Sequence, residues 1–103
     1  STGISTEDRA ATIRVAIDKN SGPNDIIIPG HIYPLAAHPA GLRGRRGHTE
    51  GSIALATACG VSPAVLMSEI LTADGRMARG EELFEFSDRL DIPIIDIQTI
   101  SGL

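Results

Sequence analysis

The segment from Gly44 to Glu50, with the sequence GRRGHTE, combines a guanidinium, an imidazole and a hydroxyl group. Its pattern predicts that a helix begins here, and a helix N-terminus presents unpaired N–H groups and a partial positive charge. Arg45 beside that terminus, with Thr49 as a capping hydroxyl, would suit a phosphate group. His48 lies in the same segment, where an imidazole can ligate a metal ion or transfer a proton.

Each of these residues also has a plain structural interpretation. A surface histidine near a helix cap explains His48 equally well, because short motifs are often accidental. Taken singly, Arg45 and Thr49 are more often a solvated arginine and an ordinary N-cap. Arg43 and Arg46 are expected to face solvent. The chemical interpretation therefore depends on these residues acting together.

Two further polar residues stand in apolar segments. His31 opens one of them, and its simpler interpretation is a hydrogen bond to a neighbouring backbone group, with catalysis as the minority view. Glu69 interrupts the run over residues 65–71, so we expect its carboxylate on or near a mostly buried strand. Burial would raise its pKa and favours a site role or a buried ion pair. His38 is expected at the surface and Asp74 in a turn.

The composition indicates one domain. The chain has 103 residues, of which 42% are hydrophobic but only 3% aromatic, so Ile, Leu, Val and Ala must fill the core. A net charge of −4 and a pI near 5.2 argue against a nucleic-acid partner. Cys59 is the one cysteine, which excludes an internal disulfide and fits a reducing cytoplasm. Without an apolar leader or a membrane-length apolar run, we expect a soluble cytoplasmic protein that binds no membrane.

Apolar periodicity and turn residues predict the elements that must position these side chains. Ser5 followed by Asp8 resembles a capping box at a helix start, Gly60 stops another helix, and Asp74-Gly75 is a hairpin signal. In chain order, the predicted elements are a helix over 6–18, a strand over 31–37, a helix over 50–58, strands over 64–71 and 76–78, a helix over 80–90 and a strand over 92–97. This alternation predicts an α/β (α+β) domain with a layered mixed sheet flanked by helices. The abrupt start at Ser1 leads us to expect that part of the fold is missing.

Several motifs together resemble a known family. They are, in order, STGIS with Asp8-Arg9, PGHIYPL over 29–35, RRGHTE over 45–50, SEI over 68–70 and DGRMAR over 74–79. This order closely resembles the C-terminal half of 3,4-dihydroxy-2-butanone 4-phosphate synthase, over nearly the whole chain. The resemblance implies that residues 1–103 are the C-terminal portion of a single domain of that family. Tyr33 and Ser68 depart mildly from its usual Phe and Cys.

The resemblance also implies a function. Members of that family are riboflavin-pathway lyases that convert ribulose 5-phosphate into 3,4-dihydroxy-2-butanone 4-phosphate and formate with Mg²⁺ or Mn²⁺. They act as homodimers with the site near the subunit interface, and they often carry a GTP cyclohydrolase II domain downstream. By the same resemblance, His48 binds the metal, and His31 and Glu69 are essential for catalysis. The substrate-binding positions that it implies are Arg45, Arg46, Gly47, His48, Thr49 and Glu69.

Two interpretations remain open at this point. The family's N-terminal half, with its acidic Arg-Glu-Gly-Glu-type loop and second metal ligand, is absent from these 103 residues. The chain is then either a fragment of an enzyme, inactive by itself, or a non-catalytic phosphate-binding or dimerisation module. We favour the enzyme fragment, because a ketopentose phosphate needs an anion clamp, a divalent ion and proton-transfer groups. The matched residues offer these groups in part.

Overall fold

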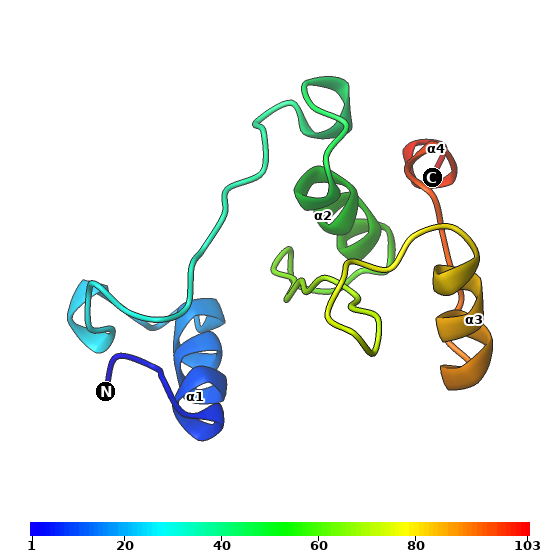
Figure 1. The fold of residues 1–103 in the computed structure, drawn as a ribbon. Coiled ribbons are helices and arrows are strands. Elements are labelled where there is room, and N and C mark those ends of the chain that lie inside the picture. Colours follow the sequence, from blue (N-terminus) through cyan, green and yellow to red (C-terminus); the bar gives the residue numbers. More distant parts are fainter. The chain divides into compact units, whose positions relative to one another are not determined.

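The computed structural model describes every residue from 1 to 103. The chain divides into two compact units, residues 1–37 and 38–103, which are described separately below. The first contains α1 and the short 3₁₀ helix η1, and the second contains the 3₁₀ helix η2 and helices α2 to α4 (Figure 1). Their bounds are α1 Thr6–Ile17, η1 Pro23–Asp25, η2 Gly41–Arg43, α2 His48–Ala58, α3 Glu81–Leu90 and α4 Ile97–Ser101.

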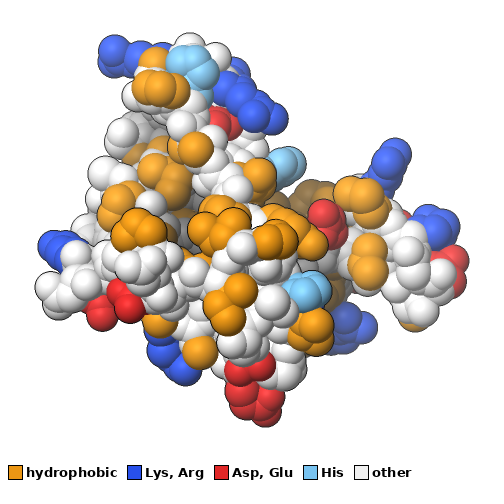
Figure 2. Space-filling view, turned by 90° about the vertical axis from the view of Figure 1, so that its left-hand side faces the viewer, with side chains coloured by type: hydrophobic (Ala, Val, Ile, Leu, Met, Phe, Trp, Pro, Cys, Tyr) orange, Lys and Arg blue, Asp and Glu red, His pale blue; other side chains and the backbone are white.

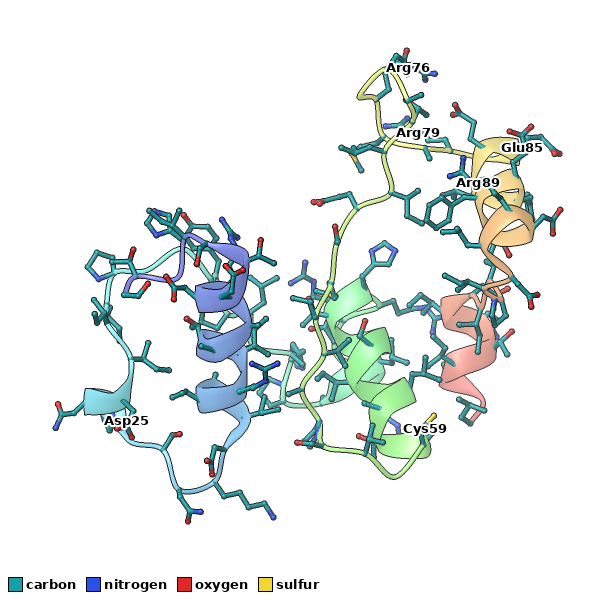
Figure 3. The ribbon with its side chains drawn as sticks, turned by 90° about the horizontal axis from the view of Figure 1, so that it is seen from below. Asp25, Cys59, Arg76, Arg79, Glu85 and Arg89 are labelled. Carbon is teal, nitrogen blue, oxygen red and sulfur yellow. The ribbon has the colours of Figure 1, made fainter.

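Helix α1 begins as its sequence predicts. Ser5 is the N-cap, and its hydroxyl accepts a hydrogen bond of 3.1 Å from the backbone N–H of Asp8. Such a cap typically stabilises a helix by about 1 kcal/mol. The helix ends at Ile17, one residue before the predicted end, and the break over residues 20–24 leads into η1. Asp25, labelled in Figure 3, accepts a hydrogen bond of 2.7 Å from the N–H of Gly22 at this turn.

The strand predicted over residues 31–37 is wrong. His31 donates its backbone N–H to the carbonyl of Thr2 at 2.8 Å, but residues 32–37 adopt no regular secondary structure. A β-strand is stable only when a neighbouring strand pairs with its backbone groups. No strand of this chain lies beside the segment. The run of apolar residues in this segment therefore favours a strand but does not supply a partner for it.

Helix α2 is longer than predicted at its N-terminus and ends as expected. It begins at His48, two residues before the predicted start. At its C-terminus the N–H of Gly60 bonds to the carbonyl of Thr57 at 3.0 Å, and that of Val61 bonds to the carbonyl of Ala56 at 3.1 Å. This pair of bonds is a Schellman motif, and Gly60 accommodates its positive φ of 72°. Cys59, an exposed free thiol, lies at this end of the helix (Figure 3).

The strand predicted over residues 92–97 is wrong as well: residues 92–96 have no regular secondary structure, and helix α4 begins at Ile97. The carboxylate of Asp96 accepts a hydrogen bond of 2.7 Å from the N–H of Thr99 and caps the helix. Gly51 of α2 allows α4 to approach closely, because a Cβ at that position would lie 2.5 Å from Cδ1 of Ile97. Ile100 and Ala56, each only 7% exposed, form the small core of this region.

Between α2 and α3 the chain forms a hairpin without a sheet. The turn at Asp74-Gly75 is confirmed: Thr72 donates its N–H to the carbonyl of Arg76 at 2.7 Å, and Gly75 has a φ of 87°. The predicted strands over 64–71 and 76–78 shrink to one antiparallel bridge between Leu71 and Met77. The layered sheet that the sequence predicted is therefore not formed in these residues. Each strand lacks the neighbour that would satisfy its backbone groups.

Helix α3 confirms the prediction to within one residue, and Arg89 lies over the ring of Phe86 at 5.6 Å from its centroid. Many large hydrophobic side chains nevertheless remain at the surface, where they appear orange in Figure 2. Leu66 is 74% exposed, and Leu35, Leu71 and Phe84 are also exposed. None of the helices has both the length and the apolar character needed to cross a membrane.

Candidate functional site

The candidate site is the start of α2. The preceding residues, 38–47, form a loop that is called the 38–47 loop below. Helix η2 lies within the loop and packs against α2. Gly47 is the N-cap of α2, with extended backbone and no side-chain capping bond. Thr49 is therefore the second residue of the helix and not its cap, which corrects the sequence prediction. The N-terminal N–H groups of α2 carry the partial positive charge that favours anions.

Glu50 connects the helix to the first residue of the 38–47 loop, a contact that was not predicted from the sequence. Its side chain is 1% exposed, and its Oε2 accepts a hydrogen bond of 2.9 Å from the backbone N–H of His38. Its Oε1 lies 3.8 Å from Nε of Arg45 and has no hydrogen-bond partner. One signal was available: a glutamate three residues after an N-cap is the position that reaches back in a capping box.

The surroundings of Glu50 favour its charged form. The hydrogen bond from the backbone N–H of His38 lowers the pKa of the Glu50 carboxyl, and the charge of Arg45 lowers it further. Burial opposes this change but does not outweigh it. Glu50 is therefore a carboxylate at neutral pH and balances part of the positive charge at the start of α2.

Gly47 is needed here because of space. A Cβ at this position would lie 2.6 Å from Oε1 of Glu50 and 3.3 Å from Nε of Arg45. A distance below 3.0 Å would force the carboxylate to move. Gly47 therefore leaves space for the Arg45–Glu50 pair and contributes no side-chain group of its own.

The remaining residues of the predicted loop face outward. The side chain of Arg45 is 72% exposed, and His48, the first residue of α2, is exposed without a hydrogen bond to its ring. Arg46 is also exposed, and its guanidinium donates a hydrogen bond of 3.0 Å to Oε1 of Gln98 in α4. Thr49 is half-buried. The structure thus brings Arg45, His48 and Thr49 to one helix end, where an anion could approach from solvent.

His31 belongs to the first unit, and its ring contacts a side chain distant in sequence instead of the neighbouring backbone group of the simpler interpretation. The ring is half-buried, and Nδ1 lies 3.0 Å from the hydroxyl oxygen of Thr2. The same two residues also share the backbone hydrogen bond described above. Thr2 thus holds both the backbone and the ring of His31 in place.

Glu69 lies in the second unit, and the expectation that it is buried is wrong. Its side chain is exposed on the irregular segment that leads into the Leu71–Met77 bridge. The physical reason is the missing sheet, because no strand or helix covers the apolar residues on either side of it. Its carboxylate is therefore accessible and has no ion-pair partner.

The residues of this chain do not complete a metal site. No three or more His, Cys, Asp or Glu side chains lie close enough together to hold a metal ion. Mg²⁺ demands several oxygen ligands in octahedral geometry, and a single imidazole does not provide them. The nearest carboxylate to the helix start, Glu50, is buried and already bonded to His38. His48 is the candidate ligand that this helix start offers.

Solved structures share this backbone trace. A crystal structure of 3,4-dihydroxy-2-butanone 4-phosphate synthase of Candida albicans matches with a TM-score of 0.92 and 43% identity, covering 99% of this chain and 53% of its own. A structure of 3,4-dihydroxy-2-butanone 4-phosphate synthase in complex with two magnesium ions matches with a TM-score of 0.77 and 31% identity, covering 95% and 50%. The chain therefore shares the fold of these synthase structures and covers about half of each.

Sequence comparison identifies the family. The 3,4-dihydroxy-2-butanone 4-phosphate synthase of Chromobacterium violaceum is 42% identical over 100 residues, covering 97% of this chain and 48% of that protein. A sequence model of the 3,4-dihydroxy-2-butanone 4-phosphate synthase family matches residues 1–102, and the chain belongs to this family. It spans about half the length of the curated relatives that it matches.

Proposed function

We propose that residues 1–103 are the C-terminal portion of a single synthase domain that acts in riboflavin biosynthesis. The reaction converts D-ribulose 5-phosphate into 3,4-dihydroxy-2-butanone 4-phosphate and formate. The observation that carries the proposal is the start of α2, where Arg45, His48 and Thr49 meet at a helix N-terminus within a chain that matches the family over residues 1–102. The alternative of a non-catalytic phosphate-binding or dimerisation module is not favoured by these matches.

In this proposal the start of α2 holds the phosphate group of the substrate. The Arg45 guanidinium is 72% exposed and lies too far from Glu50 for a hydrogen bond, so its donors are available to an anion. The first N–H groups of α2 are directed toward this end of the helix, since helix N–H groups face the N-terminus. Arg46, Gly47 and Thr49 complete the substrate-binding segment.

We assign His31 and Glu69 to the chemical step, as proton-transfer or substrate-orienting groups. The proposal rests on their agreement with essential family positions. The accessibility of Glu69 supports it, because a carboxylate that acts on a substrate must reach it. Enolisation and dehydration of a ketose both require such groups within hydrogen-bond reach of the carbon skeleton.

We propose that the enzyme requires Mg²⁺ or Mn²⁺ and that His48 contributes one ligand. The support is the related structure described as a complex with two magnesium ions. No group of three or more ligating side chains is present here, and we propose that further ligands come from the part of the family's domain that residues 1–103 do not cover. We further propose a cytoplasmic homodimer, supported by the exposed thiol of Cys59 and by the large hydrophobic side chains at the surface.

The test uses the full-length protein, by which we mean the longer polypeptide expected to contain residues 1–103. Formate release from ribulose 5-phosphate is measured with Mg²⁺, with Mn²⁺ and with EDTA. We expect turnover with either ion and none with EDTA. A full-length protein that binds inorganic phosphate but releases no formate under any of these conditions would support the non-catalytic module instead.

A further inference from the structure

The only large side chain that is almost completely buried in this protein is a charged one, Glu50. It joins two parts of the chain that are twelve residues apart, because its Oε2 accepts the backbone N–H of His38. Burying a carboxylate costs free energy unless partners replace the lost water. A buried carboxylate at the base of the proposed substrate loop therefore calls for a reason beyond packing.

His38, expected at the surface without a role, is the point about which the 38–47 loop folds. Its ring Nδ1 accepts a hydrogen bond of 3.0 Å from the N–H of Ala40, and its carbonyl accepts one of 2.8 Å from the N–H of Gly41. A Cβ on Gly44 would lie 2.0 Å from this ring nitrogen, so the glycine permits the ring to pack against the loop. Through its bond to His38, Glu50 fixes the whole loop to α2.

The second oxygen of Glu50 faces Arg45. Oε1 has no hydrogen bond although it is buried, and the Arg45 Nε lies 3.8 Å away, in an ion pair and not in a hydrogen bond. The ion pair therefore orients the guanidinium without occupying all of its donors. Gly47 leaves just enough room for this arrangement.

We propose that Glu50 is a positioning residue: by bonding to His38 and pairing loosely with Arg45, it fixes the guanidinium beside the start of α2 and thereby sets the affinity for the substrate's phosphate group. This proposal rests on the proposed function of the same loop. In this proposal Glu50 does not contact the substrate, because its side chain is only 1% exposed. Its contribution therefore belongs to binding and not to the chemical step.

The experiment is a double-mutant cycle in the full-length protein. Glu50→Gln keeps the size of the side chain and an acceptor for His38 but removes the charge that faces Arg45. The KM and kcat for ribulose 5-phosphate, and the inhibition constant of inorganic phosphate, are measured for Glu50→Gln, Arg45→Ala and the double variant. We expect Glu50→Gln to raise KM and the phosphate inhibition constant by about three- to tenfold, with kcat changed less than about twofold.

In the Arg45→Ala background the same Glu50→Gln change should have little further effect, because the group that it positions is absent. The matched control is Asp96→Asn, which neutralises a carboxylate that also accepts a backbone N–H, at the N-cap of α4. This control should leave KM and kcat unchanged.

Additive effects in the two backgrounds, or a fall in kcat with KM unchanged, would overturn the proposal. If the Glu50→Gln protein shows no thermal unfolding transition and is therefore unfolded, the Gly47→Ala variant is used in its place. The Cβ of the new alanine must displace the Glu50 carboxylate. Gly47→Ala should then raise KM, and should do so only when Arg45 is present. The two proposals can fail separately. If the proposed function is wrong, the wild-type protein releases no formate. Direct titration with inorganic phosphate still measures the coupling between Arg45 and Glu50 in that case.

Discussion

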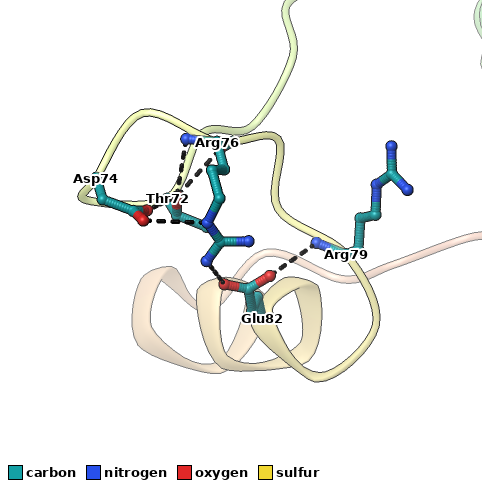
Figure 4. Close-up of polar contacts among 5 residues, drawn as sticks. All are labelled: Thr72, Asp74, Arg76, Arg79 and Glu82. Atoms are coloured by element: carbon teal, nitrogen blue, oxygen red, sulfur yellow. Dashed lines mark hydrogen bonds and ion pairs between the residues drawn. The ribbon is translucent and has the colours of Figure 1, made fainter.

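Two polar clusters of the second unit use the same residue types in opposite surroundings. At the start of α2, the carboxylate of Glu50 is 1% exposed and its hydrogen bond spans twelve residues of the chain. In the hairpin after Glu69, Arg76 pairs with Asp74 at 3.0 Å and with Glu82 at 3.3 Å (Figure 4), but the Arg76 and Asp74 side chains are each 64% exposed. Exposed ion pairs contribute little to stability because water competes for both charges.

The hairpin cluster is nevertheless well organised locally. The hydroxyl of Thr72 bonds to the carboxylate of Asp74 and accepts the N–H of Arg76 at 3.1 Å. The bond from Thr72, followed by that from Arg76, lowers the pKa of the Asp74 carboxyl. The N–H of Arg79 donates to Glu82 of α3 at 3.3 Å. The comparison shows that the hairpin contacts join residues close in sequence and define a turn. The buried contact of Glu50 joins residues twelve apart and determines where the 38–47 loop lies.

The largest expected effect concerns the exposed group at the start of α2. Replacing His48 by Ala in the full-length protein should abolish formate release, because the imidazole is the only candidate metal ligand of this helix start. The unfolding temperature should change little, since the ring is exposed and makes no hydrogen bond. Formate release is measured at saturating Mg²⁺. Undiminished release by the His48→Ala protein would refute the metal assignment.

The second prediction concerns Glu69, on the segment that precedes the hairpin. Glu69→Gln is nearly isosteric, so it removes charge and proton transfer with little change in shape. We expect a large fall in kcat with near-normal thermal stability, because the side chain is exposed and has no ion pair. A parallel His31→Ala variant should also lose turnover. If Glu69→Gln turned over normally, or simply unfolded, Glu69 would return to a structural role.

The third prediction separates binding from chemistry at the start of α2. Arg45→Ala removes a charge-assisted contact with a typical net value of about 1.5–3 kcal/mol, so substrate binding should weaken by about ten- to a hundredfold. Arg43→Ala, an exposed arginine of η2, is the matched control and should bind normally. A substrate complex with its phosphate beyond hydrogen-bond distance of both Arg45 and Thr49 would contradict the clamp.

The fourth prediction uses pH to test the buried cluster. Folding lowers the pKa of Glu50, so its charged form stabilises the fold fully above the unfolded pKa of about 4.3, and this stabilisation disappears as the pH falls through the lower folded value. The difference in Tm between the wild type and Glu50→Gln should thus be largest near neutral pH and shrink below about pH 4. Thermal unfolding is followed across this range. A difference that does not vary with pH would show that the carboxylate charge is irrelevant.

The smallest expected effect belongs to the hairpin. Arg76→Ala removes both ion pairs, yet its Tm should fall by less than half of the shift caused by Glu50→Gln at neutral pH, because these pairs are exposed. Both variants are compared in the same unfolding experiment. An equal or larger shift for Arg76→Ala would break the comparison between the two clusters.

Local sequence signals predicted helices α1, α2 and α3 and the turn at Asp74-Gly75, but not helix α4. The caps at Ser5 and Gly60 and the turn at Asp74-Gly75 lie where they were expected, because each depends on contacts within a few residues. The strands failed for the opposite reason, since a strand requires a partner that a local pattern does not specify. The lack of a partner strand also explains why Glu69 is exposed and not buried as expected.

The sequence by itself determined the family, because several of the family's motifs occur in the chain in the same order. It also determined that an arginine, a histidine and a threonine lie together within residues 44–50. Only the tertiary structure decided that Thr49 lies inside the helix instead of capping it, and that Glu50, and not Glu69, is the buried carboxylate. The physical reason is that burial and pairing depend on residues distant in sequence. His38 reaches Glu50 across twelve residues in a structure in which η2 packs against α2.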